Sequence, residues 1–330
     1  MRQYGLGGNV TRRGLLGACG AGLATCSPGL ALDQGYAAGT ESDRPKVRRW
    51  PEQTSWQDEP PQHAVTTGTV PLDHGHLSYW DTGGDGAPLV LLHAATGSML
   101  CWGYQQPVLA GAGYRVIGYS RRGHYGSELA PGDPAGSAAA DLLRLIDHLG
   151  IARCHLLGTA AGGFYVADFA VAHPERLLSL TIASSLAGLS DPDFTAVTRA
   201  MLPPGWPELP AEFRELGPSY RAANPKGTAR WVHLEEMSIP GDPVRQERSG
   251  NVTRAALAGL PVPILLMTGD ADLYMPPARM RELAEALPNA RLAILGEAGH
   301  AAYWEQPVAF NAALLEFLGE AGEGYQAGVS

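Results

Sequence analysis

Two residues in the C-terminal part of the 330-residue chain have the chemistry and position to carry a proton, Asp272 and His300. Asp272 stands three residues after Gly269, which ends an apolar run, and His300 follows a short loop after the next apolar run. An imidazole titrates near neutral pH, and a carboxylate bound to its far N–H fixes its tautomer. We expect His300 to act as a base or proton carrier oriented by Asp272, with Asp270 capping the turn. The alternative for His300 is a loop histidine bonded to backbone.

These residues belong to an alternation of two kinds of segment. Short apolar runs that predict strands are separated by longer patterns with helical spacing. The predicted strands cover residues 76–80, 88–93, 114–119, 153–158, 177–183, 262–268 and 291–295, and the predicted helices cover residues 102–112, 135–149, 162–173, 277–287 and 304–318. This alternation indicates an α/β fold with a mostly parallel central sheet flanked by helices on both faces.

Positions 158–163, Gly-Thr-Ala-Ala-Gly-Gly, follow one predicted strand and precede a predicted helix. In that place they resemble the nucleophile elbow of α/β hydrolases, G-x-S-x-G, where small residues allow a sharp turn that pushes the central side chain into the site. The central position, a serine in that motif, is Ala160 here. Runs of glycine and alanine are common, so this hexapeptide alone is weak evidence for the family.

Four further segments resemble the same family. Leu92-His93-Ala94 and the stretch to Trp102 resemble the segment that shapes the oxyanion hole, and positions 119–127 are similar to its D-x-R-G-x-G-x-S loop. The stretches around Asp272 and His300 resemble its acid and histidine loops, in the family's chain order. Over about residues 68–318 the chain is therefore identified as a member of the α/β hydrolase superfamily, similar to the AB hydrolase-1 type with a helical lid.

The resemblance implies an oxyanion hole built from backbone N–H groups, one from Ala161 and one from Ala94 or Ala95. Backbone donors survive the loss of a side chain, so this half of the site can persist beside Ala160. His93 is expected to be a structural hydrogen-bonding residue beneath the oxyanion loop. Aromatic candidates for an apolar substrate pocket, each of which could equally be ordinary packing, are Trp102, Tyr125, Phe164 and Tyr303.

Ala160 closes the usual serine acyl-enzyme route, because a methyl group cannot attack a carbonyl carbon. Four interpretations are open: an engineered Ser-to-Ala inactive esterase, direct catalysis by His300 and Asp272, a non-catalytic protein that binds a small ligand, and a structural or interaction protein. Direct catalysis would permit hydrolysis, a lyase reaction or cofactor-free oxygenation. Alanine keeps backbone strain that glycine would relieve, which favours a site still shaped for a ligand. We expect a hydrolase acting on a small carbonyl compound such as an ester or lactone.

Four regions follow one another along the chain. We expect a twin-arginine signal peptide over residues 1–31, a Pro-rich linker over 32–65, the hydrolase domain over 66–320 and a C-terminal tail over 321–330. Within the domain, a proline-rich stretch at about 186–259 interrupts the alternation of strands and helices. An insertion of this size between two strands predicts a lid.

The N-terminal segment indicates export. The sequence Thr-Arg-Arg-Gly-Leu-Leu at positions 11–16 resembles a twin-arginine signal, and the uncharged run behind it is too short and glycine-rich to span a bilayer. We therefore expect a secreted or extracytoplasmic protein. The alternatives are a disordered basic N-terminus and a loose lipobox ending at Cys26, which would carry a lipid anchor and in which Thr25 fits poorly.

Net charge and cysteine content limit the classes of partner that the chain is expected to bind. The net charge is −9, and removal of Arg2, Arg12 and Arg13 with the signal would bring it to about −12, which argues against nucleic acid or an anionic membrane. Of four cysteines only Cys101 and Cys154 would remain, too few for a disulfide framework. The histidines form no metal-ligating cluster and no Gly-rich phosphate loop is present, so we expect no metal and no cofactor, only a small-molecule substrate or ligand.

Overall fold

The computed structural model describes residues 46–56, 58–130 and 132–327. The chain divides into two units, residues 1–39 and 40–330, and every described residue belongs to the second. The expected signal peptide, with Cys26, therefore lies outside the described residues. Within the described part of the chain, no helix has both the length and the apolar character needed to cross a bilayer.

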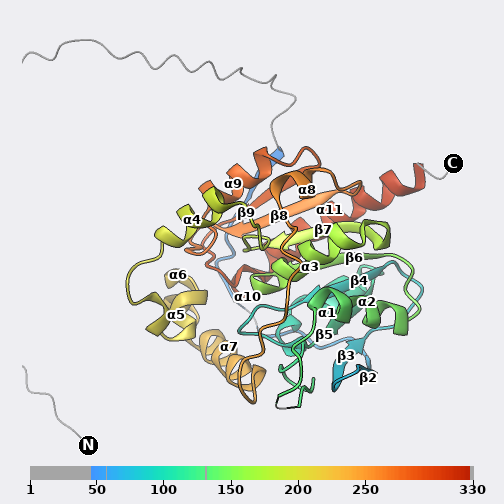
Figure 1. Ribbon diagram of the computed structural model, residues 1–330. Coiled ribbons are helices and arrows are strands. Elements are labelled where there is room, and N and C mark those ends of the chain that lie inside the picture. The colour runs from blue at the N-terminus through green and yellow to red at the C-terminus, as the bar shows by residue number, and fades with distance from the viewer. Residues whose placement is uncertain (1–45, 57, 131, 328–330) are drawn as a thin grey trace, which may run out of the picture. The chain divides into compact units, whose positions relative to one another are not determined.

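A nine-stranded sheet forms the centre of this unit (Figure 1). Its strand order is β1-β9-β8-β7-β6-β4-β5-β3-β2, and only the β2–β3 and β3–β5 pairs are antiparallel. The strands are β1 (Lys46–Trp50), β2 (Thr66–Pro71), β3 (His76–Asp81), β4 (Pro88–Leu92), β5 (Arg115–Tyr119), β6 (Cys154–Thr159), β7 (Leu177–Ala183), β8 (Ile264–Gly269) and β9 (Ala290–Leu295). The predicted mostly parallel α/β sheet is confirmed.

Helices cover both faces of the sheet, which explains why the central strands are apolar along their whole length. In β4, Val90 and Leu92 belong to one buried cluster and Leu89 and Leu91 to another. The first cluster includes residues of α2 (Ala138–His148), α3 (Ala161–Ala172) and α9 (Pro277–Glu285), and the second includes residues of α1 (Gln106–Gly111), α10 (Ala302–Glu305) and α11 (Pro307–Ala327). Helix α11 continues into the segment expected to be a tail from residue 321.

The stretch between β7 and β8, residues 184–263, is the insertion expected from the sequence. Its regular elements are α4 (Pro192–Ala200), the short 3-10 helix η4 (Trp206–Glu208), α5 (Ala211–Glu215), α6 (Pro218–Ala223), α7 (Pro225–Ser238) and α8 (Arg254–Ala258). Asp168 of α3 accepts a hydrogen bond from the backbone N–H of Ser249, which ties the returning part of the insertion to the sheet domain. We call residues 184–263 the insertion below.

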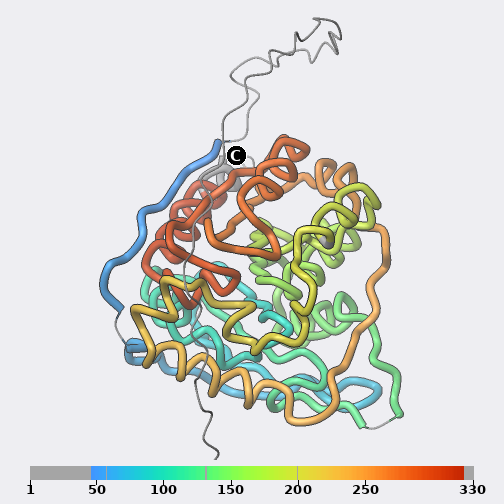
Figure 2. Tube along the Cα trace, turned by 90° about the vertical axis from the view of Figure 1, so that its left-hand side faces the viewer, coloured from blue at the N-terminus to red at the C-terminus, as the bar shows by residue number. Residues whose placement is uncertain are grey.

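The described part of the expected linker is not a linker. Residues 46–50 form β1, which pairs in parallel with β9, whereas β2 lies at the opposite edge of the sheet. The segment between them therefore crosses the domain, and Figure 2 shows it in blue along one side of the molecule. The N–H of Gln53 donates to Gln306 Oε1 at 2.7 Å, and Trp56 Nε1 donates to the Glu305 carbonyl at 2.9 Å. The sequence did not predict these contacts, because they are isolated hydrogen bonds in a polar, proline-rich segment that has no apolar periodicity.

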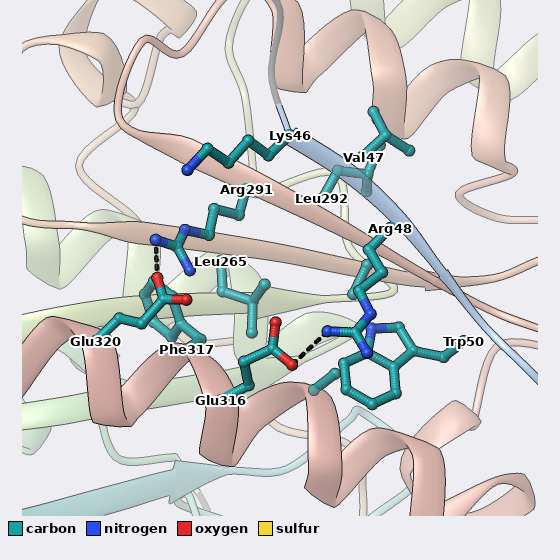
Figure 3. Close-up of a pocket in the computed structure, with 12 residues that line it drawn as sticks. Lys46, Val47, Arg48, Trp50, Leu265, Arg291, Leu292, Glu316, Phe317 and Glu320 are labelled. Atoms are coloured by element: carbon teal, nitrogen blue, oxygen red, sulfur yellow. Dashed lines mark hydrogen bonds and ion pairs between the residues drawn. The ribbon is translucent and has the colours of Figure 1, made fainter.

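Ion pairs join edge strand β1 and its neighbour β9 to α11 (Figure 3). Arg48 of β1 points toward Glu316, and Arg291 of β9 points toward Glu320. The Arg48 guanidinium also lies over the Trp50 ring, 4.1 Å from its centroid. Solvent-exposed ion pairs contribute little individually, so we attribute the attachment of β1 mainly to its hydrogen-bonded pairing with β9.

Candidate active site

Ala160 occupies a sharp turn between β6 and α3. Its φ is 51° and its ψ is −116°, a backbone conformation that residues with a Cβ rarely adopt. A Cβ added to Gly158 would lie 2.5 Å from the Gly162 carbonyl carbon, and one added to Gly162 would lie 2.3 Å from the Leu92 oxygen. The small residues at this turn are therefore required by close backbone packing, as the sequence predicts.

Asp272 and His300 lie against each other. The Nδ1 atom of His300 is 2.9 Å from Oδ1 of Asp272, which also accepts hydrogen bonds from the N–H groups of Tyr274 and Met275. Burial by itself would raise the pKa of the Asp272 carboxyl, but the charge of His300 and these hydrogen bonds lower it. Asp270 is exposed and is not part of this pair. The carboxylate is thus ionised and fixes the imidazole through Nδ1, so that Nε2 lies on the far side of the ring.

A cavity of about 230 Å³ brings the elbow and the histidine together. Its lining comes from the insertion and from the segments that follow the carboxyl ends of the strands, which we call the sheet edge. The lining residues are Ala95, Thr96, Ala160, Ala161, Phe164, Ser184, Ser185, Leu186, Arg214, Glu215, Tyr274, Met275 and His300. The separate predictions for Ala160 and His300 therefore converge on one site. Among the described residues, no group of three or more His, Cys, Asp or Glu side chains could hold a metal ion.

The residues that line the cavity distinguish between Ala94 and Ala95, the two alternatives for the second oxyanion donor. Ala161 and Ala95 line the cavity, whereas Ala94 does not and is 3% exposed. The Ala94 carbonyl accepts hydrogen bonds from Gly97 N, at 3.2 Å, and from the Arg121 guanidinium, also at 3.2 Å. These bonds hold the loop that carries Ala95, so of the two alternatives Ala95 is the one that shares the cavity with Ala161.

His93 supports this loop from below. The Arg121 N–H donates to His93 Nε2 at 3.0 Å, so the proton of the ring lies on Nδ1, which donates to the Ala94 carbonyl at 2.7 Å. Burial, with smaller contributions from His124 and Arg121, holds the pKa of His93 well below its usual value. His93 is therefore a neutral, structural hydrogen-bonding residue, as expected from its position at the strand end.

Of the four aromatic candidates, only Phe164 lines the cavity. Trp102 and Tyr303 pack against each other with ring centroids 5.1 Å apart, and both are almost completely buried. Tyr125 is not among the lining residues either. Spacing alone does not tell a buried core aromatic from one that lines a pocket. Cys101 also lies outside the cavity, and burial raises the pKa of its thiol to about 12.

Glu215 and Ser184 are among the polar cavity residues that had no signal in the sequence. Glu215 Oε2, from α5 of the insertion, lies 3.8 Å from Nε2 of His300. Ser184 has a φ of 47°, and its buried Oγ has no hydrogen-bond partner among the described residues. Neither residue belongs to a spaced motif. The approach of the two side chains to one cavity depends on how the insertion packs beside the end of β7.

The charge state of His300 follows from these neighbours. Burial alone would lower its pKa, but the carboxylates of Asp272 and Glu215 raise it to about 9. Burial raises the pKa of Glu215 as well. In the free protein at neutral pH the imidazole is therefore protonated, and it becomes a base as the pH approaches 9.

A model of the alpha/beta hydrolase family matches residues 89–313, which include the elbow, the acid loop and the histidine loop. The chain belongs to the α/β hydrolase family. A 2-hydroxy-6-oxononadienedioate/2-hydroxy-6-oxononatrienedioate hydrolase from Paraburkholderia phymatum is 30% identical over 269 residues, covering 74% of this chain and 91% of the relative. This relative of the α/β hydrolase is named as a hydrolase.

Solved structures agree on the fold. A thermophilic esterase from Thermogutta terrifontis matches with a TM-score of 0.63 and 24% identity, covering 78% of this chain and 99% of the esterase. A bromoperoxidase from Bacillus anthracis matches with a TM-score of 0.62 and 23% identity, covering 77% and 99%. The fold of this α/β hydrolase is therefore shared by an esterase and a bromoperoxidase, and the fold alone does not define a substrate.

Proposed function

We propose that this α/β hydrolase is an exported enzyme that hydrolyses a small ester or lactone by direct attack of water, without an acyl-serine intermediate. The observation that carries the proposal is the shared cavity of Ala160, His300 and the two backbone donors, with Asp272 behind the imidazole. Because the elbow offers only a methyl group, a water molecule has to supply the attacking oxygen. The cavity volume of about 230 Å³ fits a small substrate.

The chemistry follows from what each group can do. Neutral His300 accepts a proton from water as the water oxygen bonds to the carbonyl carbon, and the C=O electrons move to the oxygen. The N–H groups of Ala161 and Ala95 stabilise this oxyanion. As the C–O bond to the leaving group breaks, the imidazolium returns the proton to the departing alkoxide. Since the pKa of His300 is raised to about 9, activity should increase with pH up to that value.

The test uses p-nitrophenyl esters and small lactones with the parent chain, His300→Ala and Ala160→Ser. We expect the parent to hydrolyse a substrate of this class, His300→Ala to lose on the order of 10²–10⁴ in kcat, and a serine-directed phosphonate to label only Ala160→Ser. Retention of parent activity in His300→Ala would overturn the proposal. So would labelling of the parent at Ser184, which would indicate a covalent route.

Two other outcomes separate the remaining functions. An inert parent beside an active, phosphonate-labelled Ala160→Ser would identify a serine esterase from which the nucleophile has been removed. Saturable binding of a carbonyl ligand without product from either form would identify a ligand-binding protein. In both cases hydrolysis by water at this site would be abandoned.

Export is the second part of the proposal. The twin-arginine-like sequence at positions 11–16 and the uncharged run behind it support it. We expect a fusion of residues 1–40 to a reporter that exits the cytoplasm only when folded to be exported, and replacement of Arg12 and Arg13 by lysine to block that export. Release of the reporter independent of both arginines would contradict the assignment.

A further inference from the structure

Glu215 approaches His300 from the side opposite Asp272. Asp272 contacts Nδ1, while Glu215 Oε2 lies 3.8 Å from Nε2, the nitrogen that has to take the proton from water. Glu215 and His300 line the cavity that contains Ala160, whereas Asp272 lies behind the imidazole. The imidazole therefore lies between two carboxylates, one from the sheet edge and one from the insertion.

The Glu215 carboxylate is buried but makes no side-chain hydrogen bond to another described residue. It is 7% exposed, and its separation from Nε2 is too long for a direct hydrogen bond. Its backbone carbonyl, in contrast, accepts a hydrogen bond from Ala301 N at 2.9 Å, which fixes α5 beside the histidine loop. A buried carboxylate without a protein donor requires water or a ligand as its partner.

The other ionisable groups around this pair come from several elements. Arg214 precedes Glu215 on α5, Glu235 lies on α7, and both act on the charge of Glu215. Glu305 of α10 acts on His300, and the Tyr274 ring lies 4.4 Å from the imidazole. The Glu305 carboxylate already accepts the N–H groups of Gly217 and Gly299. Glu305 is thus occupied in joining the insertion to the histidine loop, and Glu215 is the carboxylate left facing the cavity.

The 3.8 Å between Glu215 Oε2 and His300 Nε2 allows one water molecule to bond to both atoms. Two polar atoms 3.8 Å apart can both lie about 2.8 Å from one water oxygen, a normal hydrogen-bond length. The methyl group of Ala160, in the same cavity wall, leaves unfilled the space that a serine hydroxyl would occupy. Glu215, His300 and Ala160 together therefore define a place for the oxygen that the elbow lacks.

We propose that Glu215 is a further catalytic residue: with His300 Nε2 it holds the attacking water in the place of the missing serine hydroxyl. This inference rests on the proposed function. One O–H of the water donates to Glu215 and the other to neutral His300, so a lone pair of the oxygen is directed at the carbonyl carbon. As the C–O bond forms, the C=O electrons move to the carbonyl oxygen and His300 takes one proton, which gives an oxyanion and an imidazolium. The second O–H stays bonded to Glu215.

The test compares Glu215→Ala, Glu215→Gln and the control Glu212→Gln in the full chain. Glu212 lies on the same helix but does not line the cavity. We expect Glu215→Ala to lower kcat about 10- to 100-fold, because the water loses one anchor. Glu215→Gln keeps a hydrogen-bonding side chain but removes the charge, so its pH–rate profile should move to lower pH by on the order of one unit. Glu212→Gln should match the parent in both respects, with thermal unfolding confirming that all variants fold.

A second background separates this role from a structural one. In Ala160→Ser the serine hydroxyl takes the place of the water, so Glu215→Ala should cost at least tenfold less kcat there than in the parent. An equal cost in both backgrounds, or a parent-like kcat for Glu215→Ala, would overturn the inference while leaving hydrolysis itself intact.

An NMR titration of the His300 ring needs no turnover. In Glu215→Gln its pKa should fall below that of the parent and of Glu212→Gln. If the parent hydrolyses nothing, the proposed function fails by that result, whereas an unchanged His300 pKa would separately overturn the contact between Glu215 and the imidazole.

Discussion

The sheet edge and the insertion build the site in different ways. At the sheet edge, the turn at Ala160 and the oxyanion loop are fixed by backbone contacts so close that a Cβ at Gly162 would lie 2.3 Å from a carbonyl oxygen. The insertion contributes side chains, Arg214 and Glu215, from the five-residue helix α5. Geometry set by backbone contacts persists when a side chain changes, and this explains how the elbow keeps its shape without a serine.

The same contrast explains the charges of the site. Asp272, from the sheet edge, is held by hydrogen bonds from two backbone N–H groups and from the imidazole. Glu215, from the insertion, has no such donors and acts on His300 only across 3.8 Å. The first carboxylate orients the imidazole, and the second adjusts its charge and faces the cavity. Substitutions at the sheet edge should therefore lower the free energy of unfolding. Substitutions at Glu215 in the insertion should instead change the pKa of His300.

The largest effect is expected from Gly162→Ala. The added Cβ would meet the oxygens of Leu92 and His93 at 2.3 and 2.7 Å, and backbone atoms cannot rotate away as a flexible side chain can. We expect the free energy of unfolding, measured by urea denaturation, to fall by about 3 kcal/mol. In the insertion, a Cβ at Gly241 would meet nothing within 4 Å, so Gly241→Ala should change stability by less than about 0.5 kcal/mol. An equal loss of unfolding free energy at Gly162 and Gly241 would contradict the difference in backbone packing between the sheet edge and the insertion.

The parts of the site that could be predicted from sequence are those with a fixed place along a strand. Asp272 and His300 follow buried strands, and Gly158 and Gly162 flank Ala160 at a spacing that close packing imposes. Glu215 could not be found, because its position depends on the path of residues 184–263, where prolines and short helices give no period. Trp102 and Tyr303 were assigned to the pocket because burial in the core and burial against a ligand favour the same residue types. Strand β1 was missed because polar residues on an edge strand show no apolar alternation.

The pH dependence of stability shows how much of the raised pKa of His300 is due to Glu215 of the insertion. The folded-state pKa of His300 is raised to about 9 from an ordinary value of 6.5, so its contribution to stability is fully present below 6.5 and is lost as the pH rises through 9. Glu215→Gln should lower that folded-state pKa, leaving less stability to lose. Between pH 6.5 and 9.5 the parent should lose about 1.4 kcal/mol more than Glu215→Gln, the equivalent of one pKa unit.

Urea midpoints across this pH range, with Glu212→Gln as the control, provide the measurement. The control should lose as much stability as the parent, since Glu212 does not line the cavity. Parallel curves for the parent and Glu215→Gln would mean that the sheet edge alone sets the charge of His300, through Asp272.

The smallest effect is expected from Ala160→Gly. With φ at 51° and ψ at −116°, Ala160 is in a conformation that glycine adopts freely, so the substitution removes strain from the folded state. Glycine also gives the unfolded chain more freedom, which offsets part of the gain, and the net stabilisation should be about 1 kcal/mol. Ala161→Gly, one residue later and already helical, has no strain to relieve and should be destabilising. If both substitutions destabilise, the turn is not strained, and the retention of alanine at position 160 has to be explained by the packing of its methyl group in the cavity wall.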